Sequence, residues 1–291
     1  MPKAAPLTID PSSPPFDRYT HVRWLAPDRR GQESYGRGRH HLFTAREKHN
    51  PVNVLIKVTS KPGLVYEHDL DNELSSLTTI NRELPDSRYF PFVYDHGRLK
   101  DSRRFLITSL FDEFPLATII GTEPEPALLV RDLRIGIEIA RALDQLHGLE
   151  IFHVDLNPMN VLYRTGTDRP VVRIIDFESS YERRRHSTGV FYSPPTTAGY
   201  SASEVSRQPP DARADVFSLG SVLYTLLAGY RWSARADVRG RIAADETLDA
   251  DLKNALLRAV DPKPERRFAT VEQFESALGA YLESIWPGRR W

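Results

Sequence analysis

The chain has 291 residues, of which 40% are hydrophobic and 27% are charged, a composition typical of globular proteins. Basic and acidic residues number 39 each, so net charge favours neither nucleic acid nor an anionic membrane as a partner. The absence of cysteine excludes disulfides, zinc-thiolate sites and cysteine nucleophiles. The sequence has no signal-peptide core and no apolar run long enough to cross a bilayer. We therefore expect a cytoplasmic protein, with an effector secreted without a signal peptide as the alternative.

The first part of the chain has the pattern of strands. Residues 1–18 are rich in proline and serine, which predicts a flexible leader. Over residues 19–110, β-rich runs at 52–58 and 105–110 predict strands. Between these runs, leucines at helical spacing predict a helix over residues 66–80. We therefore expect a small, β-rich N-terminal lobe that contains one helix.

The second part of the chain, residues 111–291, has the pattern of helices. Apolar stripes predict amphipathic helices over residues 128–146, 252–260 and 271–285. Residues 216–229 are apolar on all sides, which predicts a buried helix. A β-rich lobe followed by a helical lobe indicates an α+β protein with a cleft where the lobes join.

Three oxygen-bearing side chains indicate the chemistry. Asp155 and Asn160 lie five positions apart, and Asp176 follows sixteen residues later after an apolar run. Phosphoryl transfer from a nucleotide needs a carboxylate near the acceptor hydroxyl, and it needs oxygen ligands for magnesium. This spacing therefore predicts that Asp155 is catalytic and that Asn160 and Asp176 bind metal and nucleotide.

These motifs resemble those of the eukaryotic-type (Hanks-type) Ser/Thr protein kinase superfamily over about residues 19–285. The run His153–Asn160 is similar to the catalytic loop H-R-D-x-x-x-x-N, and Asp176 opens a segment similar to D-F-G. The resemblance implies a bilobal kinase-like fold, ATP as the nucleotide and Mg²⁺ as the ion, with Mn²⁺ as the alternative. It also implies that His153 is structural and that the base is Asp155.

The resemblance extends to the N-terminal lobe. Lys57 closes the run Val54–Lys57, which is similar to the V-A-I-K strand, so it would neutralise the phosphates of ATP. A carboxylate on the following helix must hold this lysine, and Glu73 is the first candidate, with Glu67 as the alternative.

Further nucleotide contacts are expected at two places. The segment 31–38 resembles a glycine-rich phosphate loop, but Glu33 occupies a position that is usually glycine, and two registers remain open. The other expected contacts lie where the lobes join. The expected nucleotide-binding residues at these places are Gly31, Gly36, Gly38, Thr108, Ser109 and Leu110.

The chain departs from the family pattern at three positions in the catalytic segments. Val154 replaces an arginine that engages a phosphorylated loop, so activity is expected without loop phosphorylation. Asn157 replaces a catalytic lysine; its amide can still hydrogen-bond the transferring phosphoryl group, which predicts slower catalysis. Glu178 replaces glycine and could supply a third metal ligand.

Motifs in the second half favour protein substrates. Thr197 and Glu204 lie in a run similar to the T-x-x-Y-x-A-P-E segment, which shapes the platform for a protein substrate. Asp215 is expected to accept backbone hydrogen bonds from the catalytic loop. Arg267, with Arg266 as second choice, is expected to pair with Glu204.

We therefore expect ATP-dependent phosphoryl transfer to Ser/Thr hydroxyls of protein substrates. Two alternatives remain open. The first is a pseudokinase that serves as a binding or scaffold protein, favoured by the unusual glycine segment, Asn157 and Glu178. The second is a small-molecule phosphotransferase, which only the run Asp176–Glu178 supports.

Overall fold

A computed structural model describes residues 10, 12–25, 40–50, 52–120, 126–164, 169–195, 197–229 and 237–288. The chain divides into two compact units. The N-terminal unit comprises residues 1–85 and 91–112, and the C-terminal unit comprises residues 86–90 and 113–291.

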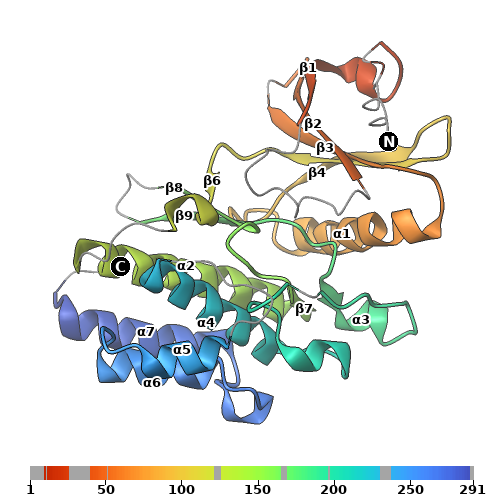
Figure 1. The fold of residues 1–291 in the computed structure, drawn as a ribbon. Helices are drawn as coiled ribbons and strands as arrows, with labels where there is room; N and C mark the ends of the chain where they lie inside the picture. The colour runs from red at the N-terminus through yellow and green to blue at the C-terminus, as the bar shows by residue number, and fades with distance from the viewer. Residues whose placement is uncertain are drawn as a thin grey trace, which may run out of the picture. The chain divides into compact units, whose positions relative to one another are not determined.

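The N-terminal unit is built on a five-stranded antiparallel sheet with the strand order β1-β2-β3-β5-β4 (Figure 1). Every second residue of the central strand β3 points into the core, so Val54, Ile56 and Val58 are fully buried. The strands are β1 (Tyr19–Trp24), β2 (His40–Glu47), β3 (Asn53–Thr59), β4 (Val93–Arg98) and β5 (Arg104–Ser109).

The core of this unit reaches back into the expected leader. Residues Phe16–Arg18 form a short 3-10 helix, η1. Phe16 is buried, and its ring packs edge-on against Phe105 of β5 with 5.8 Å between centroids. Residues 1–18 are rich in proline and serine, but they include Phe16. Because burial of this aromatic side chain is favourable, the end of the expected leader packs against the sheet.

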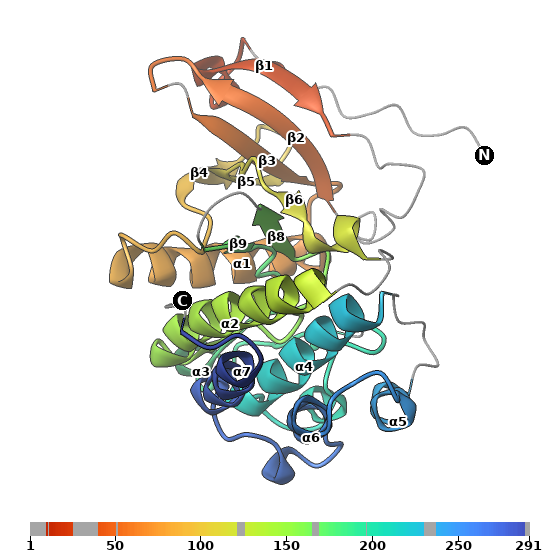
Figure 2. The same ribbon diagram turned by 90° about the vertical axis from the view of Figure 1, so that its left-hand side faces the viewer.

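The helix of the N-terminal unit is α1 (Leu64–Glu83), longer at both ends than the predicted range 66–80. It begins after Gly63, whose φ of +117° suits glycine. Its apolar side chains Leu70, Leu77 and Ile80 are buried. The helix contacts β3, β4 and β5, and Figure 2 shows it beside β4.

The C-terminal unit is mostly helical. Residues 86–90, which the sequence pattern groups with the strands, belong to it because Ile174 donates to the carbonyl of Tyr89 and the Tyr89 hydroxyl donates to Glu138. The helices are α2 (Pro126–Gly148), α3 (Arg183–His186), α4 (Ala212–Ala228), α5 (Val238–Ala244), α6 (Ala250–Ala259) and α7 (Val271–Ile285). Short 3-10 helices occupy Leu116–Ile119, Ser203–Ser206 and Pro264–Arg266.

Two small sheets complete the C-terminal unit and carry the predicted catalytic segments. The strands β6 (Phe114–Pro115), β8 (Val161–Arg164) and β9 (Val171–Ile174) form one sheet, and β7 (Ile151–Phe152) pairs with β10 (Tyr181–Glu182) in the other. The loop from β7 to β8 contains Asp155 and Asn160, and the chain leaving β9 contains Asp176.

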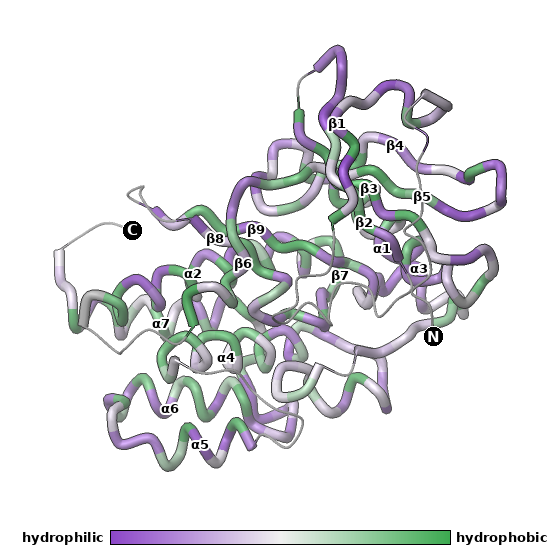
Figure 3. The backbone as a smooth tube through the Cα atoms, turned by 45° about the horizontal axis from the view of Figure 1, so that its top comes forward, coloured by the Kyte–Doolittle hydropathy of each residue, from purple (hydrophilic) through white to green (hydrophobic). Residues whose placement is uncertain are grey.

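Helix α4 is the buried helix that the apolar run predicts. Asp211 caps its start by accepting a hydrogen bond from the Arg213 backbone, and Gly229 ends it with φ of +70°. Hydrophobic colour dominates this helix in Figure 3. Its interior side chains are almost all buried. The amphipathic helices α6 and α7 lie within one residue or two of their predicted ranges.

Within the described parts of the chain, no helix combines the length and the apolar character that crossing a membrane requires.

We expect Gly220→Ala to destabilise the C-terminal unit. A Cβ atom at Gly220 of α4 would lie 2.9 Å from the Cβ of Ala259 and 3.0 Å from Cγ1 of Val260. Overpacking of this kind costs about 1–3 kcal/mol, measurable as a lower free energy of unfolding in urea. In the matched control, Gly279→Ala on α7, the added Cβ meets nothing within 4 Å. The control should be neutral or stabilising by up to about 1 kcal/mol, and equal losses in both variants would contradict the packing argument.

Candidate active site

The loop from His153 to Asn160 is a compact turn held by its own side chains. The side-chain amide nitrogens of Asn157 and Asn160 each donate to the carbonyl oxygen of Asp155, both at 3.0 Å. The Asn157 side-chain oxygen accepts from the backbone of Met159 at 2.9 Å. Both ends of the Asn157 amide therefore bond the loop backbone. The nitrogen of the Asn160 amide is used in the same way, so its oxygen is the atom that could ligate a cation.

A buried carboxylate on α4 anchors this loop, as the sequence predicts. Asp215 accepts hydrogen bonds from the backbone of His153 at 2.9 Å and of Val154 at 2.7 Å. It also contacts Nε2 of His147 at 2.8 Å. Burial alone raises the pKa of Asp215, but the hydrogen bond from His147 and the other contacts outweigh it, so the pKa lies below its usual value. Asp215 therefore remains an ionised acceptor at neutral pH.

The bonds to Asp215 hold an unfavourable backbone conformation. Val154 has φ of +66°, in the left-handed region that β-branched residues rarely adopt. Such conformations cost about 1–3 kcal/mol and persist only where the surroundings impose them. The side chain of Val154 is fully buried in an apolar cluster with Phe152, Tyr181 and Ala202. A valine here thus packs against the chain that follows the expected metal-binding segment, where an arginine would offer charge.

His153 has the structural role that we predict. Its ring is fully buried, and Nε2 lies 3.1 Å from the carbonyl oxygen of Ile175, next to Asp176. Burial lowers the pKa of His153, so the imidazole is neutral at pH 7. Its ring meets Phe177 edge-on at 5.1 Å, and Phe177 in turn meets Phe90 at 6.0 Å. These aromatic contacts fix the residue after Asp176.

Asp155 lies beside a threonine that approaches from a distant segment. The hydroxyl of Thr197 donates to Oδ1 of Asp155 at 2.6 Å. This bond fixes the orientation of one carboxylate oxygen. The other oxygen can then face an acceptor hydroxyl without a rotation of the side chain.

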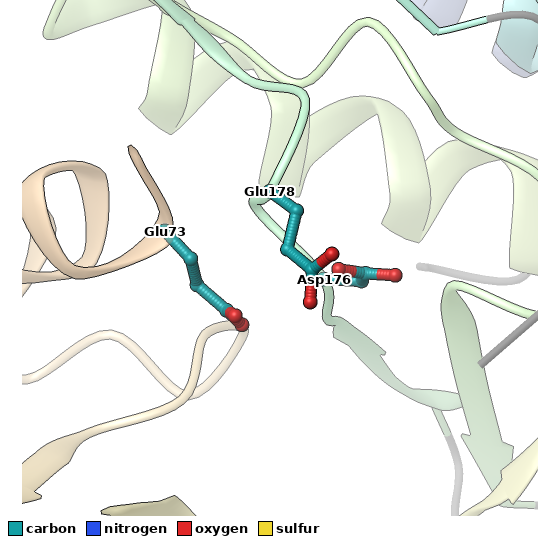
Figure 4. Close-up of side chains that lie close together, drawn as sticks. All are labelled: Glu73, Asp176 and Glu178. Atoms are coloured by element: carbon teal, nitrogen blue, oxygen red, sulfur yellow. The ribbon is translucent and has the colours of Figure 1, made fainter. Parts of the chain in front are cut away.

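The expected metal-binding groups lie on neighbouring segments. The backbone of Ile175 donates to the carbonyl of Asn160 at 3.0 Å, which joins the chain before Asp176 to the end of the loop. Asp176 itself has φ of +67°. Figure 4 shows the carboxylates of Asp176 and Glu178 turned toward the same space, with an oxygen of each within 4.8 Å of the other. Two carboxylates at this separation fit a divalent cation that prefers oxygen ligands.

In the N-terminal unit, the predicted ion pair is present. Nζ of Lys57 lies 2.6 Å from Oε2 of Glu73, and both side chains are buried. The strand β3 continues two residues beyond Lys57, so the lysine lies inside the strand. Glu67, the alternative partner, instead pairs with Arg98 of β4.

The other expected nucleotide contacts are only partly described. Gly31, Gly36 and Gly38, together with Glu33, lie outside the described residues. Thr108 and Ser109 end β5, and Thr108 is buried. The backbone N–H groups of Ser109 and Leu110 donate to the carbonyls of Phe92 and Asn53 within the unit. A nucleotide at this place would therefore use carbonyl oxygens or side chains of Ser109 and Leu110.

The segment Thr197–Glu204, which is predicted to shape a substrate platform, is held in place by an ion pair between Glu204 and Arg267. Glu204 and Arg267 form two hydrogen bonds, NH1 to Oε1 at 2.5 Å and NH2 to Oε2 at 3.0 Å. The Arg267 side chain is fully buried and also donates to the carbonyls of Arg213 and Asp261. Arg267, the first choice from sequence, is thus the partner, and Arg266 is exposed.

The sequence did not assign a role to His147. His147 lies in the last turn of α2 and contacts Asp215 through Nε2, so it belongs to the anchor of the loop that carries Asp155. His147 lies six residues before His153, on the helix that leads into the loop, and this position is the sequence feature that could have indicated its role.

Comparison with known proteins identifies the family of the chain. The sequence profile of the protein kinase domain matches residues 98–277. Aligned segments are 39% identical to ribosomal protein S6 kinase 2 beta of Xenopus laevis, 29% to serine/threonine-protein kinase Pkn1 of Myxococcus xanthus and 31% to serine/threonine-protein kinase PknG of Mycolicibacterium smegmatis. They cover 64%, 62% and 51% of this chain, and 25%, 28% and 19% of those relatives. The chain therefore spans under a third of the length of these relatives.

Among solved structures, the kinase domain of PknI of Mycobacterium tuberculosis has the same fold, with a TM-score of 0.61 at 20% identity. The match covers 90% of this chain and 96% of that one. A mutant form of the same domain has a TM-score of 0.62. The predicted α+β, kinase-like fold is confirmed.

We expect Arg267→Ala to destabilise the protein strongly because it leaves the carboxylate of Glu204 without its buried partner. The loss should be about 3–5 kcal/mol in the free energy of unfolding, measured in urea. The adjacent Arg266→Ala is the matched control. It removes an exposed arginine and should change stability by no more than about 0.5 kcal/mol. Similar values for the two variants would show that the Glu204 pair is not the stabilising contact.

Proposed function

Since the chain belongs to the protein kinase domain family, we propose that it transfers the γ-phosphoryl group of ATP to Ser/Thr hydroxyls of protein substrates. One observation carries this proposal: a single hydrogen-bonded loop presents Asp155 and Asn160 and is bonded to the chain that carries Asp176. Those three side chains are the set that in-line phosphoryl transfer uses. The serine/threonine kinases among the relatives support the same acceptor class.

The proposed roles follow from the chemistry of each group. Asp155, held by Thr197, orients the acceptor hydroxyl and takes its proton. Asn160 and Asp176 ligate the metal through oxygen atoms. Lys57 places an ammonium against the phosphates, and Glu73 holds it there. The proton, metal and phosphate tasks thus fall to different side chains.

Asn157 has a more limited role in this proposal. Its amide bonds the carbonyl of Asp155 and the backbone of Met159, so it stabilises the loop that carries the base. An amide used in this way offers less charge to the transferring phosphoryl group than an ammonium would. A slow enzyme is therefore proposed.

Protein substrates are proposed over small molecules because the segment after Thr197 is firmly built. The pair Glu204–Arg267 and the burial of Tyr200 and Ala202 give this segment a fixed shape. A fixed surface beside the base suits an extended peptide that must present one hydroxyl.

Mg²⁺ is the proposed ion, with Mn²⁺ as the alternative. The acidic pair Asp176 and Glu178, with the Asn160 oxygen, fits a hard cation that keeps several waters. Bound there, the ion would neutralise charge on the phosphates during transfer. Glu178 is proposed as an added ligand. A cytoplasmic location is proposed on the sequence alone.

The central test is phosphoryl transfer from [γ-³²P]ATP to myelin basic protein. Asp155→Asn keeps the oxygen that Thr197 bonds but removes the base, so the rate should fall about 100-fold or more. Asp144→Asn, an exposed position on α2, is the matched control and should keep the full rate. Melting temperatures should agree among the three proteins.

Two outcomes would replace the proposal. No transfer by the wild type, together with a nucleotide-dependent rise in melting temperature, would identify a pseudokinase. Transfer only to a small alcohol added in place of protein would identify a small-molecule phosphotransferase.

We expect Glu178→Gln to weaken metal binding. Removing one negative charge beside Asp176 should raise the Mg²⁺ concentration for half-maximal transfer by about tenfold. The measurement is the transfer rate across a Mg²⁺ titration at saturating ATP. The exposed Glu246→Gln serves as control. An unchanged Mg²⁺ requirement in Glu178→Gln would exclude this carboxylate as a ligand.

A further inference from the structure

The helix that carries Glu73 is fastened to the sheet at positions that the proposed chemistry does not use. Glu67, in the first turn of α1, is almost fully buried and receives a two-pronged hydrogen bond from Arg98 of β4. The distances are 2.9 Å from NH1 to Oε1 and 2.7 Å from NH2 to Oε2. Oε1 also accepts from the backbone of Gly63. This parallel geometry is the strong form of an arginine–carboxylate contact.

A second arginine contacts the helix one turn later, through a single ion pair to a partly exposed carboxylate. Arg104, the first residue of β5, pairs with Asp71 through NH2 and Oδ1. The backbone of Arg104 is bonded to the hydroxyl of Thr59 at the end of β3. Arg104 is therefore anchored in the sheet before its side chain reaches the helix.

Glu73 lies on the apolar face of the helix, between Ile80 and Leu77, and the two arginine pairs lie beyond one edge of that face. At about 100° per residue, Asp71 is about 40° from Glu67, whereas Glu73 is about 200° from Asp71. The buried Leu70 and Leu77 fall between Glu73 and the two pairs. A roll of α1 about its axis that moves Glu73 away from Lys57 would therefore strain the arginine pairs on the other side.

The far end of α1 is tied to the same strand that bears Arg98. The amide nitrogen of Asn81 donates to the carbonyl of Pro91 at 2.9 Å, and its oxygen accepts from the backbone of Val93 at 2.8 Å. Val93 begins β4, and Arg98 ends it. Helix α1 is thus attached to β4 near both of its ends, which opposes sliding as well as rolling.

We propose that Arg98 and Arg104 are positioning residues that keep α1 in the orientation in which Glu73 holds Lys57. The inference rests on the proposed function, because Lys57 matters as the phosphate-binding amine. These ties lie inside the N-terminal unit, so on this proposal the Lys57–Glu73 pair forms in the chain alone. Helix α1 then needs no partner protein to reach its working orientation.

The arrangement has a chemical basis in the buried carboxylate. The Arg98 hydrogen bond outweighs burial and lowers the pKa of Glu67, so Glu67 stays charged at neutral pH. A buried carboxylate that loses its arginine must find water or another donor, and the helix has to move for that. Loss of the contact between Arg98 and Glu67 would therefore shift α1 relative to the sheet.

A direct readout is the chemical reactivity of the Lys57 amine. Brief acetylation with acetic anhydride, followed by mass spectrometry of the Lys57 peptide, reports whether Glu73 still pairs with it. In Arg98→Ala/Arg104→Ala, the acetylation rate of Lys57 should rise by about fivefold or more relative to wild type. The matched control is Arg82→Ala, which removes an exposed arginine of the same helix that pairs with its neighbour Glu83. An unchanged rate in the double variant would overturn the inference.

The second readout is kinetic and separates positioning from general damage. The double variant should lower kcat/KM for ATP about tenfold or more, and the same two changes should have less than about threefold effect in a Glu73→Gln background. Arg98→Lys, which keeps the charge but loses the two-pronged contact, should lie between. Equal losses with and without Glu73 would show a merely structural role and would overturn the inference.

The two proposals fail in different ways. A wild type without phosphoryl transfer, but with Lys57 reactivity that rises in the double variant, would overturn the proposed function and leave the positioning role intact. If Arg98→Ala/Arg104→Ala does not fold, Arg98→Gln and Arg104→Gln tested singly give the same comparison.

Discussion

The carboxylate of Asp215 is the contact on which the candidate active site depends. Two backbone N–H groups of the loop and one imidazole converge on it in a fully buried setting. Without that acceptor, the left-handed conformation of Val154 would no longer be stabilised by a hydrogen bond. The turn that follows would then lose the geometry that presents Asp155. The anchor comes from α4, a helix buried nearly throughout, so the conformation of the loop that carries Asp155 depends on a carboxylate inside the helical core.

The departures from the family pattern become understandable as a group. Val154 fills an apolar cluster, Asn157 braces the loop, and Glu178 adds a carboxylate beside Asp176. Val154 and Asn157 have local structural partners, and Glu178 lies beside the expected metal ligand Asp176. These changes favour a catalytic segment that is shaped by packing and hydrogen bonds, at some cost in charge at the phosphoryl group.

The N-terminal unit shows a similar preference for internal contacts. Its core extends to Phe16, and its helix is bonded to two strands by two arginines and one asparagine. Ion pairs on a protein surface contribute little to stability, but Glu67 is buried and doubly bonded, which raises the consequence of removing Arg98. The orientation of Glu73 is therefore built into the sheet and helix that carry it.

Periodicity predicted the longer helices and the strands β3 and β5, because these depend on local pattern. The resemblance to a known family, through side-chain types in a known order, implied the kinase-like fold and the pairs Lys57–Glu73 and Glu204–Arg267. Other features depend on which surfaces meet after folding. The pairing of Glu67 with Arg98, the burial of Phe16 and the contact of His147 with Asp215 join residues that are far apart in the chain and ordinary in composition. The partner of a charged or aromatic residue is decided when burial removes water, which competes for the same contacts. That outcome depends on the packed fold and not on the local sequence.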